Sequence, residues 1–122
     1  MTSDECEIVI VGGGAVGCAV AYSLAVAGKT DIVLIEREPT LAAVTTSQAA
    51  GLVGQVRSTV ERVRLAMWSV RTFCQMENEA EAKPGWKQVG SLRLALNERR
   101  VAEFERLKKV ADEAGLELEF ID

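Results

Sequence analysis

The apolar positions near the start of the chain form two short runs on either side of a long uncharged stretch. Residues 8–11 are a continuous β-branched run, typical of a parallel strand covered on both faces. Residues 15–27 are rich in Ala, Val and Leu and carry no charge, so they predict a helix buried on most sides. Gly28 is placed to end that helix, and residues 31–35 predict a second strand. The pattern therefore predicts a β-α-β unit.

Apolar residues recur at helical spacing in residues 58–82, which predict a long helix. Ser58 and Glu61 have the spacing of a capping box, and Pro84 with Gly85 would end the helix. The apolar stripe consists of Val60, Val63, Met67, Val70 and Cys74.

The remaining pattern predicts a strand, a helix and another strand. In residues 86–96, leucines at every second position from Leu92 to Leu96 predict one buried face. Asn97 and Gly115 are residue types that begin and end helices, and an apolar helical stripe lies between them. Residues 116–121 alternate again and predict the last strand.

The turn after the first predicted strand has a glycine spacing typical of phosphate-binding turns. Gly12, Gly14 and Gly17 follow the spacing G-x-G-x-x-G, which allows a tight turn, close approach of a pyrophosphate and close helix packing. The following helix N-terminus presents free N–H groups to the phosphates. Glu36 ends the second strand, where a carboxylate can accept the ribose hydroxyls of an adenosine. A P-loop is excluded because no Gly-Lys-Ser/Thr follows, so a dinucleotide site is predicted.

Residues 40–56 are small, rich in hydroxyl groups and poor in charge, with neither helical nor strand periodicity. They can form a buried linker. An apolar loop of this length inside a compact domain is uncommon, however, unless it binds something.

Composition narrows the class of protein. The chain has 122 residues, 48% hydrophobic content and a net charge of -4, which argue for one soluble globular domain and against nucleic acid as a partner. No basic leader and no stretch long enough to span a bilayer are evident. Three cysteines without C-x-x-C spacing favour a reducing compartment, taken as the cytoplasm. The absence of histidine excludes Cys/His zinc sites and Ser-His-Asp triads, and no metal site is predicted.

Three motifs resemble the D-amino-acid-oxidase-like superfamily of flavoproteins, especially the dimethylglycine/sarcosine dehydrogenase group. They are GGGAVGCAVAYSLAVAGKTDIVLIE up to Glu36, TTSQAAGLVGQVR in residues 45–57, and VGSLRLAL in residues 89–96. The second motif is similar to the segment that these enzymes pack against the flavin. The third is similar to the strand that opens their substrate domain.

The resemblance implies FAD as cofactor and assigns its contacts residue by residue. The glycines and the start of the helix would hold the pyrophosphate, Glu36 would bind the adenosine ribose, and Arg37 would lie beside the adenine. The 45–52 segment would run under the pyrophosphate and the isoalloxazine ring, while Arg57 would face either the flavin edge or solvent. The cofactor-binding residues implied are Gly12, Gly14, Ala15, Val16, Gly17, Glu36, Arg37, Thr45, Thr46, Ser47, Gln48, Ala50, Gly51 and Leu52.

Gln48 departs from the pattern of the group. Those relatives have Trp-His where this chain has Ser47-Gln48, and the histidine carries their covalent flavin. Glutamine cannot form that bond, so the resemblance implies non-covalent FAD. It also implies a small-molecule amine substrate, whereas no residue of this chain can be nominated as a catalytic acid, base or nucleophile.

The fold class expected is therefore α/β: a Rossmann-like FAD-binding β-α-β start over residues 1–57, then helix, strand, helix and strand over residues 58–122. Because further parallel strands are missing, we expect an N-terminal part of a larger enzyme, completed by C-terminal sequence or by another chain. The expected function is oxidation of C–N bonds in amines or N-methyl amino acids. Two alternatives stay open at this point: an NAD(P)-binding module, and a catalytically silent subunit completed by a partner.

Overall fold

The computed structural model describes residues 5–79 and 83–121, so the last three residues of the predicted 58–82 helix lie outside the described residues. The chain divides into two compact units, one up to Leu52 and one from Val53. In the described residues, no helix is long and apolar enough to cross a membrane.

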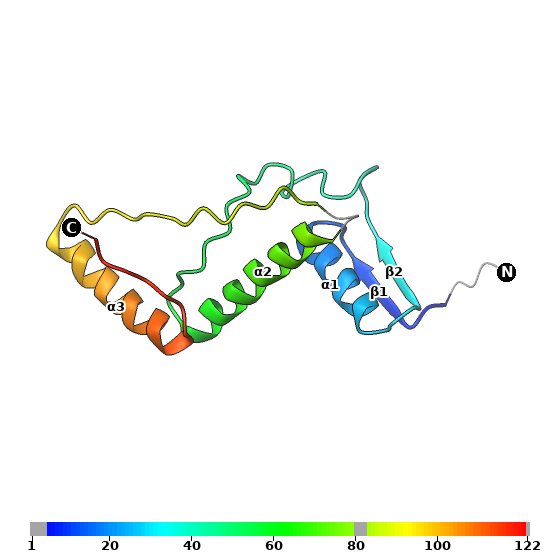
Figure 1. Ribbon diagram of the computed structural model, residues 1–122. Helices are drawn as coiled ribbons and strands as arrows, with labels where there is room; N and C mark the ends of the chain where they lie inside the picture. The colour runs from blue at the N-terminus through cyan, green and yellow to red at the C-terminus, as the bar shows by residue number, and fades with distance from the viewer. Residues whose placement is uncertain (1–4, 80–82, 122) are drawn as a thin grey trace. The chain divides into compact units, whose positions relative to one another are not determined.

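The first unit is the predicted β-α-β arrangement. Strand β1 (Ile8–Val11) pairs in parallel with β2 (Ile32–Ile35), and helix α1 (Ala15–Val26) connects them (Figure 1). The register sets Ile8 opposite Ile32 and Val11 opposite Ile35. Gly28 follows the helix with φ +85°, which confirms its predicted place as the left-handed residue after the last turn.

Burial in this unit is less than the sequence pattern suggests. Along β1, Ile8 and Ile10 are half-buried, whereas Val9 and Val11 are exposed. No residue of α1 is buried. The expectations of a strand covered on both faces and a helix buried on most sides are therefore wrong for the described chain. In the described part of the first unit, α1 is the helix that contacts both strands, and this unit provides no second helix to cover the other face of the sheet.

The second unit is a helix pair. Helix α2 (Val60–Asn78) packs against α3 (Glu98–Ala114), and the two helices carry the buried small apolar side chains of this unit. A guanidinium N–H of Arg64 also donates to the carbonyl oxygen of Glu113 at 3.4 Å. The buried residues are Val63, Ala66, Val70 and Ala111.

The helix ends follow local side-chain chemistry. Asn97 caps α3 by accepting the Arg100 N–H at 3.0 Å, and Gly115 ends it in a left-handed conformation, both as predicted. The cap of α2 is Thr59 rather than Ser58, because the Thr59 hydroxyl accepts the Arg62 N–H at 3.4 Å. The sequence indicated the correct turn but the wrong hydroxyl.

Neither predicted strand of the second unit is present. Residues 86–96 and 116–121 have no strand pairing, and Leu92, Leu94 and Leu96 are 77–86% exposed rather than buried on one face. A strand needs a neighbouring strand to receive its backbone hydrogen bonds, and the described residues provide none for either segment. The start of the first segment is nonetheless anchored, since Trp86 stacks on Phe73 with ring centroids 5.2 Å apart.

Candidate cofactor-binding site

The glycine-rich turn is built by backbone contacts that tolerate no side chains. Gly12 has φ +104°, and its N–H donates to the carbonyl oxygen of Ile35 at 2.7 Å. A Cβ on Gly17 would collide with the carbonyl oxygen of Gly12. The close packing expected of the third glycine is therefore real, and α1 starts directly beside the end of β1.

The first turn of α1 provides the features of an anion site. Gly14 precedes the helix in an extended conformation, and its carbonyl oxygen accepts the Cys18 N–H at 2.9 Å. Ala15, Val16 and Gly17 follow, and the first amides of a helix have no carbonyl partner within it. With the positive end of the helix dipole, these amides favour a phosphate.

Glu36 links the end of β2 to the turn. One carboxylate oxygen accepts the Gly13 N–H at 2.6 Å, and the other accepts the Glu38 N–H at 2.9 Å. These hydrogen bonds, that of Glu38 first and that of Gly13 next, lower the pKa of the Glu36 carboxyl below its ordinary value of 4.5. The group is therefore an anion at neutral pH, held at the position where a ribose-binding acid is expected.

Gly13 belongs to this site although the sequence analysis did not single it out. A Cβ there would collide with the Leu41 side chain and lie 3.1 Å from a Glu36 carboxylate oxygen. The signal was available, because the turn contains three consecutive glycines where the motif requires only the first and the third.

The segment after β2 folds back onto the turn. The Ala42 N–H donates to the carbonyl oxygen of Gly13 at 2.9 Å, and Ala42 itself has φ +60°. The Thr46 hydroxyl accepts the Ala15 N–H at 3.0 Å. Residues 41–47, which we call the covering segment, are thus connected to the glycine-rich turn at two points.

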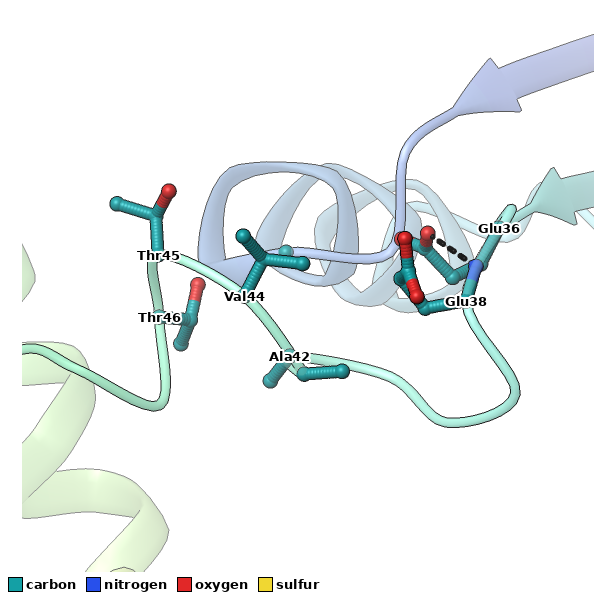
Figure 2. Close-up of a pocket in the computed structure, with 8 residues that line it drawn as sticks. Glu36, Glu38, Ala42, Val44, Thr45 and Thr46 are labelled. Atoms are coloured by element: carbon teal, nitrogen blue, oxygen red, sulfur yellow. Dashed lines mark hydrogen bonds between the residues drawn. The ribbon is translucent and has the colours of Figure 1, made fainter.

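Figure 2 shows the pocket that this arrangement encloses, with the Glu36 and Glu38 carboxylates near the turn and Thr45 and Thr46 on the covering segment. Its volume is about 170 Å³, below the roughly 300–1,000 Å³ of typical ligand pockets. The pocket can therefore take one part of a dinucleotide. The lining residues are Gly14, Glu36, Glu38, Ala42, Ala43, Val44, Thr45 and Thr46.

Several residues expected at the cofactor do not line this pocket. The Arg37 side chain is 88% exposed and pairs with Glu38 at 3.1 Å, so it does not line the pocket. The Ser47 hydroxyl donates to carbonyl oxygens of its own segment, including that of Val44 at 2.7 Å. Gln48, Ala50, Gly51 and Leu52 also lie outside the pocket, and Arg57 belongs to the second unit. Conversely, the structure adds Glu38, Ala42, Ala43 and Val44 to the lining.

Comparison with known proteins shows the family and the fold. The FAD dependent oxidoreductase family matches residues 7–122. Dimethylglycine dehydrogenase from Rattus norvegicus is 40% identical over 83% of this chain and 12% of its own length. Sarcosine dehydrogenase from Homo sapiens is 37% identical over 91% of this chain and 12% of its own length. Among solved structures, L-proline dehydrogenase from P. horikoshii is similar, with a TM-score of 0.80 and 26% identity over 91% of this chain.

A further relative is named as a regulatory subunit and not as a dehydrogenase. The pyruvate dehydrogenase phosphatase regulatory subunit from Mus musculus is 32% identical over 96% of this chain and 13% of its own length. The chain thus spans about an eighth of the curated relatives compared here and 29% of the proline dehydrogenase chain. Because the family match covers the glycine-rich turn, the acidic end of β2 and the covering segment, the chain belongs to the FAD dependent oxidoreductase family.

Proposed function

We propose that the protein oxidises a C–N bond of a secondary or tertiary amine, such as an N-methylated amino acid, with FAD as cofactor. The observation that carries this proposal is the 37–40% identity to two dehydrogenases whose names give dimethylglycine and sarcosine. Both substrates are N-methylated glycines, and the similarity extends over 83–91% of this chain.

The residues of the first unit fit the ADP half of FAD. The pyrophosphate would rest on the amides of Val16 and Gly17, since the Ala15 N–H already donates to the Thr46 hydroxyl, and Gly12 and Gly14 let the main chain approach it. Glu36 would accept the ribose hydroxyls. Its two oxygens already accept one N–H each, and a carboxylate has about four acceptor positions, so capacity remains.

The 45–52 segment would run under the pyrophosphate and the isoalloxazine ring, with Thr45 and Thr46 on the pyrophosphate side. The other expected FAD contacts of this segment are Ser47, Gln48, Ala50, Gly51 and Leu52. Bound FAD supplies the acceptor for the hydride that leaves the amine. The residues of this chain hold and orient the cofactor. Gln48 supports non-covalent attachment, because an amide cannot form the bond that a histidine makes.

A second candidate function is a non-catalytic regulatory subunit. The 32% identity to a protein named as a regulatory subunit favours it, since that relative matches the same glycine-rich region. Such a protein would retain FAD binding or only the fold, without turnover of an amine. The NAD(P) alternative has less support, because the matching family is FAD dependent.

The cytoplasmic location is a separate proposal, supported by three free cysteines. Both dehydrogenase relatives are named as mitochondrial, so cell fractionation with mitochondrial markers is the appropriate test.

The purified protein provides the decisive experiment. Visible flavin absorbance that passes into the supernatant after acid precipitation is expected for non-covalent FAD. Anaerobic addition of sarcosine or dimethylglycine should then bleach the flavin. Flavin left in the pellet would contradict the Gln48 argument. Stable binding without bleaching by any N-methylated amine would favour the regulatory candidate, and failure to bind added FAD would overturn the proposal.

A further inference from the structure

Helix α1 lacks a cap of its own. Its N-cap residue, Gly14, has no side chain, and its first turn contains no acidic residue. The other two helices are capped locally, α2 by the hydroxyl of Thr59 and α3 by the amide oxygen of Asn97. The first turn of the helix that would face the pyrophosphate is thus the one that depends on a distant residue.

Thr46 supplies that contact from the covering segment. Its hydroxyl oxygen accepts the Ala15 N–H at 3.0 Å, across a separation of 31 residues in sequence. A Cβ on Gly14 would lie 3.3 Å from this oxygen, a tight contact that would press on the hydroxyl. Because Gly14 has no side chain, the Thr46 hydroxyl has room beside the start of α1.

The position of Thr46 is fixed by neighbouring backbone contacts. The Ser47 N–H donates to the carbonyl oxygen of Ala42 at 3.0 Å, which closes the turn that contains Thr46. The Ala42 N–H in turn donates to the carbonyl oxygen of Gly13. Thr46 consequently sits in a closed turn that is attached to the glycine-rich turn, with its side chain at the start of α1.

We infer that Thr46 is a positioning residue of the proposed FAD site, acting as an N-cap for α1 from outside the helix. The inference rests on the proposed function and adds a role that acts through Ala15. By holding the first amide of α1, the hydroxyl fixes the direction of the amides on which the pyrophosphate would rest. The same hydrogen bond links the covering segment to the first turn of α1, so a change in the conformation of one affects the other.

Replacement of the hydroxyl by a methyl group of similar shape tests this role. Thr46→Val should weaken FAD binding by about fivefold, which corresponds to about 1 kcal/mol for a lost N-cap, whereas Thr46→Ser should stay within about twofold of the wild type. Riboflavin, which has no pyrophosphate, should bind the wild type and Thr46→Val equally. Flavin fluorescence titration measures all of these constants.

Thr59→Val is the matched control, because it removes the cap of a helix in the other unit. It should lower the free energy of unfolding and leave the FAD dissociation constant unchanged. Equal FAD affinity of Thr46→Val and the wild type would overturn the inference. An equal loss of affinity in Thr59→Val would also overturn it, since the effect would then reflect general destabilisation.

Amide hydrogen exchange of the cofactor-free protein separates this inference from the proposed function. The Ala15 amide should exchange about fivefold faster in Thr46→Val than in the wild type and Thr46→Ser, by the same loss of a cap. Faster exchange without any FAD binding by the wild type would support the cap and overturn the proposed function. Unchanged exchange would overturn the cap, whatever the FAD affinity.

Discussion

The two units of the chain are stabilised by different interactions. Among the described residues, the buried apolar side chains lie on α2 and α3 of the second unit, Val63 and Ala111 among them. In the described part of the first unit only Gly13 is buried, and the connections around it are hydrogen bonds to the backbone and to Glu36. The helix pair therefore depends on a small apolar core, whereas the cofactor-binding region depends on close backbone approach and polar contacts.

This difference explains why the first unit resembles a binding site more than a core. Two carboxylates and two threonine hydroxyl groups line its pocket, and each of these side chains can be tested by a single replacement. In the second unit, the decrease in the free energy of unfolding caused by a replacement should increase with the buried apolar volume removed. In the first unit, the decrease in the free energy of unfolding should depend on whether a new side chain fits at a glycine and on which hydrogen bond is removed.

The largest effect is expected at Gly17. Gly17→Ala forces a methyl group against the carbonyl oxygen of Gly12, so the free energy of unfolding should fall by about 3 kcal/mol or more and FAD binding should be lost. Denaturant unfolding and FAD titration measure both. Gly54→Ala is the control, because its Cβ would be at an ordinary 3.6 Å from Arg57. A stable Gly17→Ala protein that binds FAD would contradict the close packing described here.

Val63→Ala should disrupt the apolar core of the second unit. Val63 is 0% exposed, so the truncation should lower the free energy of unfolding by about 2 kcal/mol. Leu65→Ala on the same helix removes a side chain that is 64% exposed and should cost less than about 0.5 kcal/mol. Thermal or denaturant unfolding compares the pair, and equal losses would argue against a core at Val63.

A stabilising change is expected at Ala42. Its φ of +60° is costly for a residue with a side chain, so Ala42→Gly should raise the free energy of unfolding by about 0.5–1 kcal/mol after the entropy of glycine is subtracted. Ala43→Gly, at the next position and without a positive φ, should lower it by a similar amount. If both variants lose stability equally, the turn at Ala42 is not left-handed in solution.

The smallest effect on stability is expected from the charge of Glu36, which is half-buried. Its hydrogen bonds favour the ionised form and depress its pKa in the folded chain. Its contribution is therefore complete above the ordinary value of 4.5 and is lost as the pH falls below that value. Glu36→Gln should reduce this part of the acid dependence, as measured by the free energy of unfolding against pH. An unchanged pH profile would show that the carboxylate does not hold the turn.

Much of the chain could be predicted from local patterns. The glycine spacing, the uncharged stretch and the acid at the end of β2 indicated the β-α-β unit, and both strands and the helix are present. The end of α1 before Gly28 and the ends of α3 at Asn97 and Gly115 were also predictable. These features depend on residues within one helical turn or one strand, so neighbouring sequence contains the necessary information.

The tertiary structure decided the contacts between distant residues. The Glu36 bond to Gly13 spans 23 residues and the Thr46 bond to Ala15 spans 31, and no local pattern specifies either partner. The same reason explains the wrong strands, since the alternation around Leu94 shows what a strand would need but not whether a neighbour exists to pair with it. Sequence alone determined the β-α-β unit, the two later helices and the cofactor class. Tertiary contacts determined how the glycine-rich turn is held, because those contacts form only when separate segments meet.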